Sequence, residues 1–174
     1  VLERTYQEIE KNKDNAVVYI GGDIAHSKTD MSPELVDQLS RLFKNLSDIC
    51  PTIIIAGNHD CNLNNLSRLD VLTPIVNNLN HPNLHYLKDS GVYKCADVSF
   101  VVWDCWTKEK DFILADDVEG DTKVVLFHGT VDRAETDLGF HLPSDVHIDK
   151  FKGYDLGLLG DIHKKQFLDK EETI

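Results

Sequence analysis

The sequence has 174 residues, and its 41% hydrophobic and 28% charged residues are typical of one globular domain. No apolar run approaches the ~20 residues of a membrane-spanning helix and no segment resembles a signal peptide, so we expect no membrane partner. Acidic residues outnumber basic ones by 30 to 18, and this formal charge of −12 is unlike the basic footprint of most nucleic-acid-binding surfaces. The four cysteines lack CxxC or zinc-ribbon spacing, which indicates reduced thiols in a cytoplasmic protein.

The first third of the chain alternates predicted helices and strands. Apolar residues at helical spacing predict an amphipathic helix over residues 2–12, and the run 17–20 predicts a buried strand. Ser32 is a good N-cap for a helix over 33–49, with proline at the first helical position and another proline after its end. A second buried strand is predicted over 52–56. This alternation favours parallel strand pairing.

The rest of the chain is richer in strands. Residues 64–79 resemble a helix with a break near Thr73-Pro74, and short strands are predicted between 84 and 105. Two more apolar strands are predicted over 123–127 and 154–159, separated by a polar connection. Strands that follow one another closely imply hairpins, so we expect an α/β fold that mixes parallel and antiparallel pairing.

Each of four predicted strands is followed by a glycine beside an aspartate, asparagine or histidine. Because the carboxyl ends of strands gather the loops of an open α/β sheet, these side chains are expected to converge. Each one alone has an ordinary structural explanation, as a turn residue, a cap or a strand-end histidine. Together they predict a metal site, and mixed oxygen and imidazole ligands suit Mn²⁺, Fe²⁺ or Zn²⁺ better than Ca²⁺. The four clusters are Gly22-Asp23-Ile24-Ala25-His26, Gly57-Asn58-His59-Asp60, His128-Gly129 and Gly160-Asp161-Ile162-His163.

These four clusters, in this order, resemble the calcineurin-like metallophosphoesterase family, and Gly57-Asn58-His59-Asp60 is the most specific of them. Two stretches are similar to the Mre11/SbcD group of DNA repair nucleases and its phage recombination counterparts. They are Gly22-Asp23-Ile24-Ala25-His26-Ser27 with Ser32-Pro33-Glu34-Leu35, and Gly160-Asp161-Ile162-His163-Lys164-Lys165-Gln166. The resemblance implies a mixed β-sandwich flanked by helices, a four-layer α/β/β/α arrangement.

The resemblance also implies a role for each site residue. Asp23 would bridge two metal ions, Asn58 and His128 would bind the second ion, and His163 would bind the first. His59 would stabilise charge at the scissile phosphate or protonate the leaving oxygen, with Asp60 orienting its ring. His26 matches a histidine that faces the substrate, the alternative being a side chain that only supports the ligands or is solvated.

The implied mechanism is in-line attack on phosphorus by a metal-bound hydroxide. Two cations ~3.5–4 Å apart lower the pKa of water and neutralise charge on the phosphate. Mn²⁺ is the expected metal, with Mg²⁺, Fe²⁺ and Zn²⁺ as alternatives. Two divalent ions also offset part of the charge of −12 where a phosphate must bind.

The sequence departs from the family pattern in two places. Asp161 stands where the family usually has a histidine; it either binds the second ion, which we favour, or lies behind the ligands. The Asp-x-His pair with which the family begins does not precede Gly22. Residues 145–149 have a similar pattern of aspartate and histidine but are interpreted as loop. We therefore expect one partial domain over residues 1–174 that lacks the first strand and a C-terminal cap, and that holds the second-site ion better than the first.

Three functions follow as alternatives. The favoured one is a DNA nuclease, acting on single- or double-stranded DNA with an SbcC/Rad50-type ATPase as partner of the full-length protein. The acidic charge favours another phosphoesterase, for a nucleotide, a phosphoprotein or a small phosphodiester. The departures from the pattern favour a catalytically silent scaffold. A missing strand would leave an open sheet edge, which a homodimer would cover.

Overall fold

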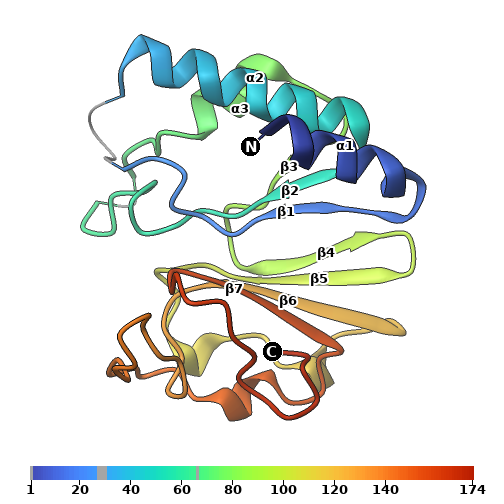
Figure 1. Ribbon diagram of the computed structural model, residues 1–174. Helices are drawn as coiled ribbons and strands as arrows, with labels where there is room; N and C mark the ends of the chain where they lie inside the picture. Colours follow the sequence, from blue (N-terminus) through green and yellow to red (C-terminus); the bar gives the residue numbers. More distant parts are fainter. Residues whose placement is uncertain (1, 27–30, 66) are drawn as a thin grey trace. The chain divides into compact units, whose positions relative to one another are not determined.

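The computed structural model of the chain describes residues 2–26, 31–65 and 67–174 and divides into two compact units, Val1–Leu87 and Lys88–Ile174 (Figure 1). Each unit has its own β-sheet, and we call them unit 1 and unit 2. Ser27, part of one stretch compared with the nuclease group, lies outside the described residues. None of the helices in the described ranges has the length and apolar character needed to span a membrane.

Unit 1 has a three-stranded parallel sheet with the order β1-β2-β3. Figure 1 shows its three α-helices on one face of this sheet. The predicted first helix, the first two strands and their parallel pairing are confirmed. The elements in chain order are α1 (Leu2–Asn12), the 3₁₀ helix η1 (Lys13–Asn15), β1 (Val18–Ile20), α2 (Pro33–Ile49), β2 (Thr52–Ile54), α3 (Thr73–Leu79) and β3 (Leu84–Tyr86).

Helix α2 begins and ends where the sequence predicts. The Ser32 Oγ accepts a hydrogen bond from the Leu35 N–H at 3.2 Å, so one N–H of the first turn is satisfied, and Pro33 occupies a position that needs no donor. The helix packs one apolar face against β2 and α3, and residues of these two elements belong to the same core. The core of unit 1 consists of Leu39, Phe43, Ile54, Leu72, Ile75 and Leu84.

The helix predicted over residues 64–79 is wrong in its first half. The described residues between 64 and 72 form turns and bends, and α3 begins only at Thr73. Asn62 Oδ1 accepts a hydrogen bond from the Asn64 N–H, and Asp70 Oδ1 accepts from Leu72 and Thr73. Short polar side chains thus capture the N–H groups that a helix would have used, which stops helix formation before Thr73.

Unit 2 has a four-stranded mixed sheet with the order β4-β5-β6-β7. Strands β4 and β5 form an antiparallel hairpin, while β5, β6 and β7 run parallel. The predicted hairpin in the strand-rich middle and the two later apolar strands are confirmed. The elements are β4 (Gly91–Cys95), β5 (Val98–Trp103), η2 (Glu109–Asp111), η3 (Ala115–Asp117), β6 (Thr122–His128), η4 (Ile148–Phe151) and β7 (Leu156–Gly160).

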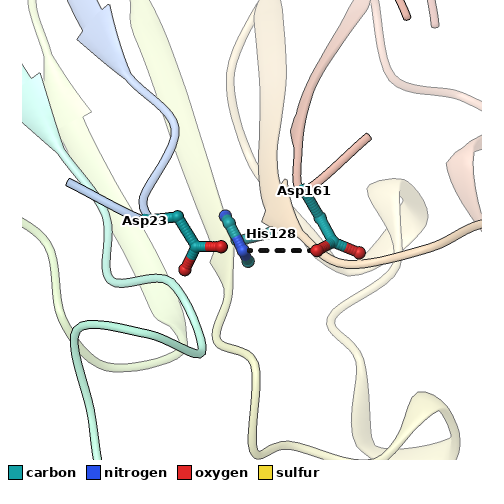
Figure 2. Close-up of side chains that lie close together, drawn as sticks. All are labelled: Asp23, His128 and Asp161. Carbon is teal, nitrogen blue, oxygen red and sulfur yellow. Dashed lines mark ion pairs between the residues drawn. The ribbon is translucent and has the colours of Figure 1, made fainter. Parts of the chain in front are cut away.

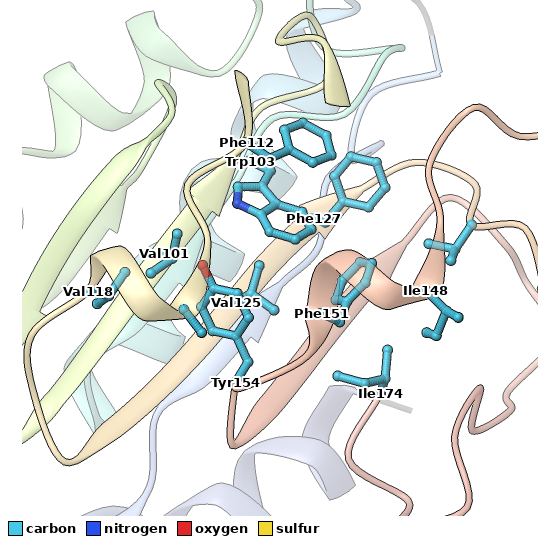
Figure 3. Packing of buried hydrophobic residues seen from close by; sticks show 12 residues of the cluster. Val101, Trp103, Phe112, Val118, Val125, Phe127, Ile148, Phe151, Tyr154 and Ile174 are labelled. Atoms are coloured by element: carbon cyan, nitrogen blue, oxygen red, sulfur yellow. The ribbon is translucent and has the colours of Figure 1, made fainter. Parts of the chain in front are cut away.

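An aromatic core covers one face of the unit 2 sheet (Figure 3). The Trp103 ring stacks on Phe112 with 4.3 Å between ring centroids, and Phe127 and Phe151 meet Trp103 edge to face. The indole N–H donates to the Ile113 carbonyl, so its one polar group is satisfied. Since side chains alternate along a strand, His128 points to the opposite face from Phe127, away from this core.

The predicted fold class is confirmed: the chain is α/β, with parallel and mixed sheets and helices packed against them. The run at 145–149, interpreted as loop, contains the start of the 3₁₀ helix η4. The prediction of a single partial domain over residues 1–174 stays a prediction.

Candidate metal centre

Four polar clusters follow strands β1, β2, β6 and β7, as the sequence predicts. Strands β1 and β2 are parallel neighbours in unit 1, and β6 and β7 are parallel neighbours in unit 2. Each unit therefore brings two of the clusters to the same sheet edge. In unit 1 these are the loops at 22–26 and 57–60, and in unit 2 the ends of β6 and β7.

In unit 1, Asp23 lies against the loop that follows β2. Its Oδ1 accepts a hydrogen bond from the His59 N–H at 2.9 Å, and its backbone is left-handed with φ 54°. A Cβ at Gly57 would lie 2.2 Å from this Oδ1 and 2.3 Å from the Asp23 backbone nitrogen. Only glycine fits there, so the close approach of the two loops depends on Gly57.

Asp60 is fully buried and joins the same two loops. One carboxylate oxygen accepts from the Ala25 N–H and the other from the Gly57 N–H, each at 2.9 Å. Burial raises the pKa of this carboxyl group, and the nearby Asp23 carboxylate adds to the shift. The prediction that Asp60 orients the His59 ring stays a prediction. Both Asp60 oxygens bind backbone N–H groups because these donors would otherwise be buried without partners.

His26 and His59 lie side by side on the exposed side of these loops. Their rings stack with centroids 6.0 Å apart and an angle of 15° between the planes. The Nδ1 of His59 lies 3.2 Å from the His26 carbonyl oxygen. Because a carbonyl can only accept, this contact places a proton on Nδ1 and leaves Nε2 as the nitrogen directed elsewhere. The His26 carbonyl is thus a hydrogen-bond partner of the His59 ring.

In unit 2, the β6–β7 register pairs His128 with Gly160 and so brings Asp161 beside the histidine (Figure 2). The buried His128 Nε2 lies 3.9 Å from Asp161 Oδ1. That distance exceeds a hydrogen bond and leaves room for an ion at about 2.1 Å from each atom. The other carboxylate oxygen of Asp161 accepts from the Thr130 hydroxyl at 3.0 Å. His128 and Asp161 belong to a group of side chains able to hold a metal ion.

Residues 1–165 match the sequence model of the calcineurin-like phosphoesterases. The chain belongs to the calcineurin-like phosphoesterase family. Members of this family are hydrolases of phosphoesters that use divalent metal ions, so the family accounts for the acidic and histidine side chains at the strand ends. Family membership confirms the coarser resemblance drawn from the four clusters.

The chain is similar to "Uncharacterized protein R555" of Acanthamoeba polyphaga mimivirus, with 39% identity over 188 residues. The comparison takes in 100% of this chain and 14% of that protein. The chain thus spans 14% of the length of the curated relative that it matches.

The calcineurin-like phosphoesterase has a further feature of a metal site at Asn58. The side-chain Oδ1 is enclosed, and no hydrogen-bond donor reaches it among the residues that the structure describes. A buried amide oxygen without a partner costs free energy, about 1–3 kcal/mol, unless a cation or water binds it. The residue that the family pattern assigns to the second ion is therefore available as a ligand.

The His163 side chain is exposed. With Asp161 it lines a hollow of 220 Å³ whose other lining residues are Thr136, Asp137, Leu142 and Ile162. The sequence assigned His163 to a different ion from His128, and this assignment stays a prediction.

Sequence reasoning missed Thr130, which holds the Asp161 carboxylate. Its position two residues after His128, at the end of β6, is the one signal that the sequence offered. Asp161 itself has a left-handed backbone, with φ 87°, which is costly for a residue other than glycine. Strained residues of this kind gather at functional sites.

Proposed function

We propose that this phosphoesterase hydrolyses phosphodiester bonds of DNA, as a nuclease of the Mre11/SbcD type that uses two divalent ions. The observation that carries the proposal is the Asp161 carboxylate, which faces the buried His128 Nε2 with one oxygen and is fixed by Thr130 through the other. The two stretches similar to the nuclease group, at 22–35 and 160–166, support DNA as the substrate. The acidic charge of −12 favours instead a small phosphoester as the competing substrate.

The proposed ligands form unequal sets. Asp23, Asn58, His128 and Asp161 are assigned to the second ion, while the first ion would have Asp23 and His163. The second-site ion is therefore the better held, and oxygen-rich coordination with an imidazole suits Mn²⁺, with Mg²⁺, Fe²⁺ and Zn²⁺ as the alternatives. Bound divalent cations supply a low-pKa water as nucleophile and neutralise charge on the phosphate.

The histidine pair of unit 1 is proposed to act on the leaving group. The Nδ1 of His59 faces the His26 carbonyl, so Nε2 of the protonated ring is the donor available for the leaving oxygen. His26 stacks on this ring and would limit its rotation. Both rings are exposed, as a group that meets a large substrate must be.

The test compares two phosphodiesters in the presence of Mn²⁺. Hydrolysis of labelled single-stranded DNA is measured beside hydrolysis of bis(p-nitrophenyl) phosphate, with EDTA-treated protein as the control. Cleavage of both substrates supports a nuclease. Cleavage of the small ester alone supports the other phosphoesterase, and binding of Mn²⁺ without cleavage of either supports a silent scaffold.

The proposal also includes a partner protein and a location in the cell. A Mre11/SbcD-type nuclease would work in the cytoplasm with an SbcC/Rad50-type ATPase. A homodimer is the other predicted assembly, and sedimentation velocity that gives a single monomeric species would count against it.

A further inference from the structure

A hairpin loop over residues 135–142 projects from unit 2 between β6 and β7. Its two ends pair through a β-bridge between Glu135 and His141, and the Thr136 N–H donates to the Phe140 carbonyl at 2.9 Å. Gly139 permits the tight turn because its φ of +79° is strained for other residues. The hairpin loop is therefore an organised turn with paired ends.

The hairpin loop is fixed to the segment that carries Asp161 and His163. The Gln166 side-chain amide accepts from the Glu135 N–H at 3.0 Å and donates to the Glu135 carbonyl at 2.9 Å, as a neighbouring strand would. Lys164 forms an ion pair with the Glu135 carboxylate. The loop and the ligand-bearing segment thus hold a defined position within unit 2.

Two large apolar side chains of this loop are open to solvent. Leu138 is 83% exposed and Phe140 is 66% exposed. Because the ends of the loop are tied down, ordering these side chains against a ligand would cost little more backbone entropy. Neither side chain lines the hollow, but both lie on the loop that forms part of its wall, and exposed apolar groups on such a loop are typical of binding sites.

The hairpin loop also forms one wall of the 220 Å³ hollow. Thr136, Asp137 and Leu142 come from the loop, and the facing wall carries Asp161 and His163. The carboxylates of Asp137 and Asp161 disfavour a phosphate inside this hollow when no cation neutralises them. A neutral ring with N–H groups suits it better, since Asp137 is able to accept from such donors and Leu142 offers an apolar surface.

We propose that the hairpin loop binds a nucleobase next to the scissile phosphate, with Phe140 as the stacking group. This inference rests on the proposed function, because it takes the substrate to be a nucleic acid strand. Stacking on an aromatic ring contributes to single-strand binding without a basic surface. It therefore explains how a chain with a charge of −12 holds a polyanion, and it implies a weak dependence of affinity on salt.

The test measures binding rather than cleavage. Fluorescence anisotropy gives the Kd of the full chain for a labelled oligothymidylate and for an abasic oligonucleotide of the same length, which has the same phosphates without bases. Phe140→Ala should weaken oligothymidylate binding about 10-fold and leave abasic binding unchanged, since stacking is lost and charge is kept. Phe140→Trp should retain the preference for bases.

Phe167→Ala is the matched control, because Phe167 is also exposed, at 54%, and lies in unit 2 but outside the hairpin loop. It should leave both affinities unchanged. Equal binding of the two oligonucleotides, or a loss of affinity for both in Phe140→Ala, would overturn the inference. The proposed function is judged separately, by whether labelled single-stranded DNA is cleaved in the presence of Mn²⁺.

Discussion

In unit 1 the acidic side chains at the sheet edge accept hydrogen bonds from backbone N–H groups, whereas in unit 2 one side-chain hydroxyl donates to the acidic side chain. Asp60 joins the loops after β1 and β2 through two backbone bonds, and Asp23 accepts a third from His59. Asp161 instead has one bond from Thr130, and its remaining oxygen faces His128.

This difference separates two tasks that carboxylates perform at the same kind of strand end. A buried carboxylate that satisfies backbone donors fixes the path of the chain, so its loss should destabilise the fold. A carboxylate with an oxygen left for an ion binds metal, so its loss should weaken metal binding with little change in stability. Substitutions of Asp60 and of Asp161 should therefore give opposite patterns in two measurements, unfolding and metal titration.

Asp60→Ala should cause the largest effect, a loss of about 4 kcal/mol in the free energy of unfolding. Two buried N–H groups, of Gly57 and Ala25, would lose their acceptors, and each such loss costs about 1–3 kcal/mol. Asp60→Asn keeps one acceptor oxygen and should cost about half as much. Urea unfolding of metal-free protein measures both. The exposed Asp37, paired with Arg41 on α2, is the control, and Asp37→Ala should change stability by less than about 0.5 kcal/mol.

Gly57→Ala should destabilise unit 1 by about 3 kcal/mol, at the upper end of ordinary overpacking. The added Cβ would meet the Asp23 backbone nitrogen at 2.3 Å, a contact that only a shift of the loops relieves. Thermal unfolding gives the loss. Gly91→Ala is the matched control, because a Cβ there has its nearest contact at 3.5 Å. Similar melting temperatures for the two variants would show that the loops are not closely joined.

The helices and strands could be predicted from the sequence wherever one local rule decides the structure. Ser32 and Pro33 fix the start of α2, and apolar runs mark the strands of both sheets. The residues between 64 and 72 were misassigned because their apolar spacing suits a helix, while Asn62 and Asp70 bind the backbone in competing turns. Spacing alone does not reveal which side chain captures a backbone donor.

The candidate site shows the same limit. Asp161 and His128 were predicted from glycine-flanked strand ends, because parallel neighbours must end at one edge. Adjacency in the sequence suggested that Asp60 contacts the His59 ring, whereas the hydrogen bonds of Asp60 in the fold come from the backbone N–H groups of Ala25 and Gly57. Thr130 was missed because a hydroxyl two residues after a histidine has no distinctive pattern.

Asp161→Ala should weaken Mn²⁺ binding by more than about 100-fold, since even the partners of metal ligands are worth about 10- to 100-fold. The free energy of unfolding without metal should change by less than about 1 kcal/mol, because Asp161 is partly exposed and accepts no backbone N–H in the described structure. Isothermal titration with Mn²⁺ is the measurement. Asp145→Ala removes an exposed carboxylate from the same unit and should leave affinity unchanged. If Asp161→Ala binds Mn²⁺ as tightly as the parent protein, Asp161 does not bind the ion and only supports the residues that do.

Thr130→Val should have the smallest effect, a loss of about 10-fold in Mn²⁺ affinity. The variant keeps the shape of the side chain and removes the hydroxyl that donates to Asp161 Oδ2. The carboxylate would then rotate freely, and its Oδ1 would no longer be held facing His128. Thr130→Ser retains the donor and should bind Mn²⁺ as the parent does. If Thr130→Val also binds normally, the carboxylate is aimed by the strained Asp161 backbone, with φ 87°, rather than by the hydroxyl. In that case unit 2, like unit 1, positions its acidic group through the main chain.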